Sequence, residues 1–185
     1  MKKRQLMISF LIGVVVMSMV VGTAFAKKPL TTLLFDEVPF QPIDGLKVNG
    51  VDFQFQVNGT PSNDARYNTA GLPPLFEYVQ CPCLEGNSRG VLTMTFDKPT
   101  TEIEFGVALN TVFPLPEGVT VELYRPGAGM LRQTVSLETS NEIFFTEGMF
   151  SYSGPAVKTM VITFDWFHAA RFILDNLTYH EHPNS

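Results

Sequence analysis

Apolar and polar residues alternate with a period of two through most of the chain beyond its first 30 residues. Leu92, Met94 and Phe96 alternate with polar residues, and the same pattern returns around Ile103 and Val119. A period of two places successive side chains on opposite faces of a β-strand, so each such strand has one apolar face to bury. The pattern therefore predicts a protein built almost entirely from half-buried strands.

Turn-forming residues, rather than helical segments, separate these runs. Asn49-Gly50 and Asn58-Gly59 bracket one run, and Pro126-Gly127 ends another. Asn, Gly and Pro favour tight turns because of their backbone preferences. The predicted strands lie at 32–36, 51–57, 91–97, 102–109, 119–125, 130–137, 142–146, 157–164 and 171–179. A spacing of about 10 to 15 residues per strand is typical of an antiparallel sandwich.

About nine short antiparallel strands, each with one apolar face, require a second layer. Two sheets packed face to face bury those apolar faces against each other. We therefore expect an all-β, antiparallel β-sandwich that forms one domain over residues 27–185, with Phe side chains filling its interior. The segment 59–90 is predicted to be irregular, with one short helical turn at Leu75–Val79.

Residues 1–26 have the pattern of a secretory signal peptide. Basic residues 2–4 precede an apolar run over 6–22, and the small–x–small sequence Ala24-Phe25-Ala26 follows. Signal peptidase cuts after such a site, so we expect cleavage after Ala26 and export to the periplasm or the medium. An uncleaved membrane anchor is the alternative, because the run approaches the length of a bilayer span.

The charge of the chain argues against two classes of partner. The formal net charge is −5, and removing residues 1–26 takes away three basic residues and no acidic residue, which leaves −8. An acidic chain without a basic cluster is unsuited to nucleic acid and to anionic membranes. No second long apolar stretch follows the first one, so we expect no membrane span after signal cleavage.

Cys81 and Cys83 are the two cysteines, and Pro82 separates them. Export permits a disulfide, but so short a ring closes only where the chain turns sharply. A metal site needs more ligands than this pair offers. A local disulfide, two free thiols, an intermolecular disulfide and a functional role all remain open.

Three segments together carry a resemblance to a known family: Leu33–Pro39, Leu84–Phe96 and Arg171–Tyr179. Their order and spacing resemble the galactose-binding-like jelly-roll β-sandwich of secreted bacterial proteins, which occurs in carbohydrate-binding modules. The layout is also similar to the exported domains of PEP-CTERM proteins, although the Pro-Glu-Pro segment and apolar sorting tail of that group are missing. The resemblance implies a jelly-roll sandwich and does not name a ligand.

The resemblance also implies a structural calcium ion that ties the first strand to the last. Asp36 and Asp175 stand where its acidic ligands would be, and Ca²⁺ prefers several oxygen ligands of this kind. Asp175 lies within an apolar strand, where a carboxylate needs a partner. In the alternative interpretation, Asp175 accepts backbone hydrogen bonds or pairs with Arg171.

The sequence Asp165-Trp166-Phe167-His168 follows the predicted strand 157–164 and is the main candidate for ligand binding. An exposed Trp166 can stack on a sugar ring while Asp165 and His168 bond its hydroxyls. Alternatively, Trp166 folds into the core with its N–H bonded to the backbone. Phe113-Pro114-Leu115-Pro116 is a second candidate surface, suited to a protein partner.

Candidates for catalysis are few. The metalloprotease, nucleophile-elbow and phosphate-loop motifs are absent. Glu102 and Glu104 share a strand face and can mimic a glycosidase pair, but alternating Glu on the wet face of a strand is commoner. His180 and His182 can grip a metal ion, although they lie near the end of the sequence. We therefore expect a protein that is not an enzyme.

These observations together predict a secreted, non-catalytic domain that binds an extracellular polysaccharide and holds a structural Ca²⁺. A cell-surface or matrix domain that binds a surface protein is the first alternative, motivated by Phe113–Pro116 and by Cys81 and Cys83. A hydrolase that uses Glu102 or Glu104 is the second alternative.

Overall fold

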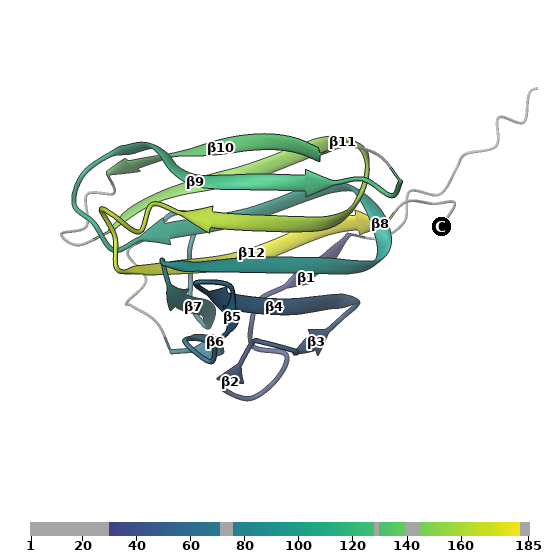
Figure 1. Cartoon of the computed structure of the whole chain (residues 1–185), viewed down its shortest axis with the longest axis horizontal. Coiled ribbons are helices and arrows are strands. Elements are labelled where there is room, and N and C mark those ends of the chain that lie inside the picture. The colour runs from purple at the N-terminus through teal and green to yellow at the C-terminus, as the bar shows by residue number, and fades with distance from the viewer. Residues whose placement is uncertain (1–29, 71–75, 128–129, 140–144, 182–185) are drawn as a thin grey trace, which may run out of the picture.

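Antiparallel strand pairing dominates the computed structural model, which describes residues 30–70, 76–127, 130–139 and 145–181 (Figure 1). In chain order the strands are β1 (Thr31–Leu33), β2 (Gln41–Pro42), β3 (Lys47–Val48), β4 (Val51–Val57), β5 (Thr60–Pro61), β6 (Ala65–Thr69), β7 (Cys83–Asn87), β8 (Gly90–Leu109), β9 (Leu115–Tyr124), β10 (Met130–Thr139), β11 (Thr146–Phe164) and β12 (Arg171–Glu181). The predicted all-β antiparallel jelly-roll sandwich is confirmed, with twelve strands within these described ranges where about nine were expected. The predicted signal peptide and His182 lie outside the described residues.

Two long strands, β8 and β11, connect the two layers of the sandwich. The first half of β8 pairs with β4 and with the second half of β11, whereas its second half pairs with β12 and with the first half of β11. The register of the β8–β11 pair shifts between Ser153 and Thr159, the part of β11 that contains Gly154 and Pro155. One continuous hydrogen-bonded sheet is thereby folded onto itself, as the curved ribbons of Figure 1 show.

The remaining strands extend the two layers. β9 and β10 follow the second half of β11, and β4 and β5 lie on the other side of β8. In the other layer β7, β6 and β2 follow β12 in that order, and β1 pairs with the later part of β12. β3 pairs with the start of β4. No helix of the described residues is long and apolar enough to cross a membrane.

The alternating apolar residues meet between the layers, as the period of two predicts. The largest fully buried side chains are mostly aromatic: Tyr67, Tyr179, Phe35, Phe53, Phe55, Phe96, Phe105 and Phe172. The ring of Phe172 stacks on that of Phe164 with 3.8 Å between centroids and tilts against Phe55 at 6.0 Å. Aromatic packing of this kind is a large share of the apolar burial.

Several expected boundaries differ in the structure. The strands expected at 91–97 and 102–109 are one bent strand, and β11 includes residues 147–156, which the sequence left unassigned. β1 ends at Leu33 rather than continuing to residue 36, because Phe35 adopts a positive φ of 60° that breaks the strand. Most of the strand expected at 142–146 lies outside the described residues.

The prediction that residues 59–90 are irregular is wrong. β5, β6 and β7 lie in this segment, and their partners β4 and β12 come from other parts of the sequence. Short strands of this kind depend on pairing with distant residues, so their own alternation is weak.

The helical turn expected at Leu75–Val79 is also wrong for its described residues, 76–79. The backbone N–H groups of Glu77 and Tyr78 donate instead to the two carboxylate oxygens of Glu147, each at 2.9 Å. Residues 76–82, here called the strap, thus cross the outer face of the β8–β12 layer. A side chain at Gly106 would meet the Tyr78 carbonyl oxygen at 1.9 Å, so glycine allows this close crossing.

A small apolar cluster and a disulfide hold the strap. Phe76 and Val79 pack with Cys83, Ala108 and Ile173 on the side of the sheet opposite the main core. Cys81 and Cys83 form a disulfide around a cis Cys81–Pro82 peptide bond. Of the arrangements that the sequence left open for the two cysteines, the structure contains the local bond.

The aromatic packing of Phe172 gives a test of the core. We expect Phe172→Ala to lower the free energy of unfolding by about 3–5 kcal/mol, because it removes a buried ring and leaves a cavity between the layers. Phe113→Ala is the matched control, since Phe113 is 65% exposed, and should change stability by less than about 0.5 kcal/mol. Chemical denaturation measures both values, and equal effects would contradict the described core.

Candidate functional site

Three connections lie next to one another at one end of the sandwich. Pairing of Val57 with Gly90 brings the turn after β4 beside the β7–β8 turn. The Ser88 backbone N–H of that second turn donates to the Ala170 carbonyl at 3.0 Å, within the β11–β12 loop. Residues 58, 87–90 and 165–170, which are far apart in the sequence, therefore share one surface.

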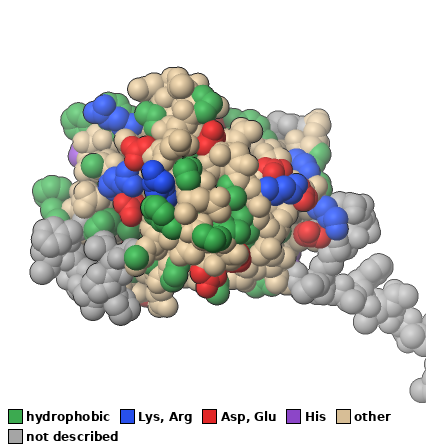
Figure 2. Space-filling view, turned by 90° about the horizontal axis from the view of Figure 1, so that it is seen from below, with side chains coloured by type: hydrophobic (Ala, Val, Ile, Leu, Met, Phe, Trp, Pro, Cys, Tyr) green, Lys and Arg blue, Asp and Glu red, His purple; other side chains and the backbone are tan. Residues whose placement is uncertain are grey.

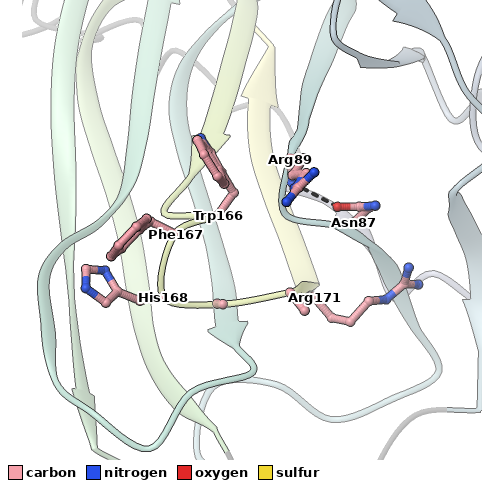
Figure 3. Close-up of a pocket in the computed structure, with 8 residues that line it drawn as sticks. Asn87, Arg89, Trp166, Phe167, His168 and Arg171 are labelled. Atoms are coloured by element: carbon pink, nitrogen blue, oxygen red, sulfur yellow. Dashed lines mark hydrogen bonds between the residues drawn. The ribbon is translucent and has the colours of Figure 1, made fainter.

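A hollow of about 400 Å³ opens among these connections, and Figure 3 shows its lining side chains. This hollow is here called the Trp166 pocket. It is lined by Asn87, Arg89, Trp166, Phe167, His168 and residues 169–171. A second hollow of about 230 Å³ is lined by Asn58, Arg89 and Trp166. Because Arg89 and Trp166 line both hollows, they lie at the boundary between them.

Trp166 is a surface residue. Its side chain is 55% exposed and that of Phe167 is 78% exposed, whereas Ala169 of the same loop is only 3% exposed. The alternative in which Trp166 fills the core is therefore wrong, and Ala169 is the loop residue that reaches the interior. The Arg89 guanidinium carbon lies 5.3 Å from the centroid of the indole ring, in a cation–π contact.

Asp165 organises the β11–β12 loop. Its Oδ1 accepts hydrogen bonds from the backbone N–H groups of Phe167 and His168, at 3.2 and 3.3 Å. Its Oδ2 contacts His168 Nδ1 at 2.7 Å, so the imidazole presents Nε2 to the surroundings. The structure places Trp166 and His168 in the pocket lining, and Asp165 beside it as the residue that orients His168.

The sequence analysis did not single out Asn87, Arg89 or Arg171 for the pocket. Asn87 accepts a hydrogen bond from the Arg89 backbone N–H at 3.0 Å, drawn in Figure 3, and donates to Asp64 at 2.9 Å. Arg171 donates to Asp64 at 2.8 Å and to Glu85 at 3.0 Å. Arg89 and Trp166 are 77 positions apart in the sequence, so only strand pairing reveals that they meet.

Asp175 is a buried carboxylate on β12, 1% exposed. Its Oδ2 accepts hydrogen bonds from the Gln80 backbone N–H at 2.7 Å and from Asn176 Nδ2 at 3.2 Å, whereas its buried Oδ1 has no hydrogen-bond partner in the part of the chain that the structure describes. The strap is thus tied to β12 through Gln80. A backbone hydrogen bond was one of the expected alternatives for Asp175; pairing with Arg171 was another, but Arg171 contacts Asp64 and Glu85 instead.

Burial raises the pKa of Asp175 to about 6, and the nearby negative charges of Asp36 and Glu37 act in the same direction. The hydrogen bonds from Gln80 and Asn176 lower this pKa, but by less than burial raises it. Asp36 itself is exposed. Within the described ranges, no group of three or more His, Cys, Asp or Glu residues is arranged to hold a metal ion.

Glu102 and Glu104 have different partners. His180 Nε2 lies 3.4 Å from Glu102 Oε2, and the Ser151 hydroxyl donates to Glu104 Oε1 at 2.9 Å. In the Phe113–Pro116 segment Phe113 is exposed, but Leu115 is buried. The apolar surface at this second candidate site is therefore carried by Phe113 and its neighbour Val112, which is 50% exposed.

Comparison with known proteins finds likeness only at the level of structure. No family model and no curated protein matches the chain. A variant of a family 29 carbohydrate-binding module is 10% identical with a TM-score of 0.41, over 82% of this chain and 85% of that one. A cleaved adhesin domain of Lys-gingipain from Porphyromonas gingivalis is 13% identical with a TM-score of 0.44, over 83% and 99% of the two chains.

A third solved structure contains xylohexaose. It comprises a family 22 carbohydrate-binding module and a catalytic module of endo-1,4-beta-D-xylanase 10B from Clostridium thermocellum; the identity is 14% and the TM-score 0.36, over 84% of this chain and 26% of that one. The resemblance to carbohydrate-binding-module-like sandwiches is thus found again among solved structures. At these values the likeness concerns the fold, and no binding residue is carried over to this chain.

The raised pKa of Asp175 predicts a pH-dependent stability. The pKa of Asp175 is about 6 in the folded protein and 3.8 in the unfolded chain. The folded state therefore binds this proton more tightly than the unfolded state does. The resulting contribution to the free energy of unfolding is fully present below about pH 4 and is lost as the pH rises through 6. Asp175→Asn imitates the protonated acid. In EDTA, we expect the variant to exceed the wild type in unfolding free energy at pH 7.5 by about 2–3 kcal/mol, and by much less at pH 4.

Chemical denaturation at both pH values checks this expectation. Glu117→Gln is the control, because it removes an exposed carboxylate. A difference between the wild type and Asp175→Asn that does not change with pH would show that Asp175 is not a buried, titrating group.

Proposed function

We propose that this chain is a non-catalytic domain that binds an extracellular polysaccharide in the Trp166 pocket. The observation that carries the proposal is the exposed indole of Trp166 at the boundary of two hollows, surrounded by polar side chains. The flat face of an indole matches the apolar C–H face of a pyranose ring, and polar groups at the rim bond the hydroxyls. His168 and Asn87 are polar side chains of the same lining.

The loops around Trp166 are held by backbone hydrogen bonds, which favours binding. The Asp165 N–H donates to the Gly118 carbonyl at 2.8 Å, and the Ala169 N–H donates to the Asp165 carbonyl at 3.1 Å. Together with the bond from Ser88 to Ala170, these contacts fix both ends of the loop. A loop that is ordered before binding loses less conformational entropy when a ligand arrives.

The proposed location is outside the cytoplasm, in the periplasm or the medium. The signal-peptide pattern of residues 1–26 supports this location. The disulfide between Cys81 and Cys83 also supports it, because such bonds persist in oxidising compartments.

We further propose that Asp36 and Asp175 bind a calcium ion. Among the described residues the buried Asp175 Oδ1 has no hydrogen-bond partner, and the pKa of Asp175 is raised by burial and, to a lesser degree, by the negative charges of Asp36 and Glu37. A divalent cation supplies positive charge to such oxygens and offsets the cost of the buried carboxylate. Asp36 follows β1 and Asp175 lies on its partner β12, so both residues are available to hold the ion between the first and last strands.

Binding of another protein at a cell surface is the second candidate function. The exposed pair Val112 and Phe113, at 50% and 65%, supports it, because adjacent exposed apolar side chains are typical of interaction surfaces. A variant at Phe113 therefore separates the two candidates.

The polysaccharide proposal predicts a large effect at Trp166. We expect Trp166→Ala to weaken polysaccharide binding about 30-fold or more, because it removes the stacking surface. Phe113→Ala should bind polysaccharide as the wild type does. Glycan arrays and isothermal titration calorimetry measure both, with circular dichroism as a check of folding; polysaccharide binding that survives Trp166→Ala unchanged would refute the site.

The calcium proposal predicts a shift in thermal stability. We expect CaCl₂ to raise the midpoint of thermal unfolding relative to EDTA, corresponding to about 2.7 kcal/mol when calcium is at 100 times its dissociation constant. Asp175→Asn and Asp36→Asn should abolish the shift, whereas Glu117→Gln should retain it. Superimposed melting curves of the wild type in CaCl₂ and EDTA would contradict the calcium site.

A further inference from the structure

The Trp166 pocket differs in charge from the rest of the molecule. The chain has a formal net charge of −5, yet the pocket lining contains two arginines and neither Asp nor Glu. The acidic residue of the β11–β12 loop, Asp165, already forms hydrogen bonds with two backbone N–H groups and with His168. The pocket thus offers positive charge where the surrounding protein is acidic.

Arg89 and Arg171 contribute to this charge in different ways. Arg171 is already paired with two carboxylates, those of Asp64 and Glu85. Arg89 is exposed, and within the described part of the chain its guanidinium has the Trp166 ring as its contact and no carboxylate within ion-pair distance. Figure 2 shows Lys and Arg side chains beside Asp and Glu side chains at two places on one face. Arg89 differs from these pairs because its guanidinium lies over an aromatic ring, as that of Arg66 does over Phe40.

We infer that the Trp166 pocket selects an acidic polysaccharide, whose sugars carry a carboxylate or a sulfate ester; this inference rests on the proposed function. The Arg89 guanidinium lies over the indole ring, 5.3 Å from its centroid, so a sugar held at the edge of that ring comes within reach of the guanidinium. Guanidinium matches carboxylate and sulfate oxygens with two parallel N–H donors, and charge-assisted bonds of this kind are stronger than those to hydroxyls.

The position of Arg89 and Trp166 also indicates a polymer rather than a single sugar. Both residues line the hollow of about 400 Å³ and the neighbouring hollow of about 230 Å³. An oligosaccharide can place successive sugars in the two hollows and pass the Arg89–Trp166 pair at the boundary. Affinity should therefore rise from an acidic monosaccharide to its trimer.

The net negative charge of the protein shapes the choice of experiment. Salt screens the local attraction at Arg89 and also the long-range repulsion between an acidic protein and an acidic polymer. Salt dependence alone therefore does not report the local contact. Ligands that differ only in charge, and variants that differ only at one guanidinium, report it directly.

Isothermal titration calorimetry on the purified protein, in buffer without calcium, provides the test. The ligands are trigalacturonate, its neutral methyl ester, a sulfated galactan oligosaccharide and neutral xylohexaose. We expect trigalacturonate or the sulfated oligosaccharide, or both, to bind about tenfold tighter than the methyl ester and xylohexaose. The two acidic ligands distinguish a carboxylate source of the anion from a sulfate source.

Variants assign the selectivity to Arg89. Arg89→Gln should remove the preference, so that acidic and neutral ligands bind this variant with affinities within about twofold of one another. Arg66→Gln is the matched control, because Arg66 lies over the ring of Phe40 at 5.2 Å, outside the Trp166 pocket, and should retain the preference.

Each other outcome overturns a stated part of the proposal. Equal affinity for trigalacturonate, the sulfated ligand and the neutral ligands, with loss of all binding in Trp166→Ala, overturns the acidic selectivity and leaves the proposed function standing. A preference that persists in Arg89→Gln overturns the role of Arg89. No binding to any of the four ligands contradicts the selectivity and counts equally against the proposed function.

Discussion

The pairing of β8 with β11 is the constraint on which the rest of the structure depends. Each strand bends and contributes one half to each layer, so the two halves of this pair connect the edges that all other strands extend. The bend brings the apolar faces of the two layers together and buries the aromatic side chains between them. It also leads the chain back to the end of the sandwich where the Trp166 pocket lies.

The Trp166 pocket lies at one end of the sandwich, whereas the strap lies on the outer face of one layer. At the end of the sandwich, strand pairing and backbone hydrogen bonds join the connections that follow β4, β7 and β11. Trp166 is exposed there beside Arg89, which has no carboxylate partner among the described residues. On the outer face, the carboxylates of Asp175 and Glu147 accept hydrogen bonds from backbone N–H groups of the strap, and both carboxylates are buried. The acidic scaffold thus carries two adjoining hollows that Arg89 lines, and this arginine gives the proposed ligand its chemical character.

Local alternation made the sheet largely predictable from the sequence. The period of two predicted strands at the positions of β4, β8, β9, β10 and β12, and the turn residues marked where the predicted strands end. β6 and β7 escaped prediction because they are short and depend on pairing with other strands, β7 with β12 and β6 with β7, which no local pattern reveals. The strap escaped it because Glu147, 70 positions away, provides the acceptors for its backbone.

The candidate site was predictable in part for the same physical reasons. Trp166 and His168 follow a recognisable strand and could be placed on an end loop, whereas Arg89 needed the pairing of Val57 with Gly90 to bring its turn to the same surface. Trp166 is the single tryptophan of the chain, so its fluorescence reports this pocket alone. Titration with an acidic oligosaccharide should change the emission with a saturating curve that matches calorimetric binding; calorimetric binding without any change in emission would contradict the Trp166 pocket as the carbohydrate site.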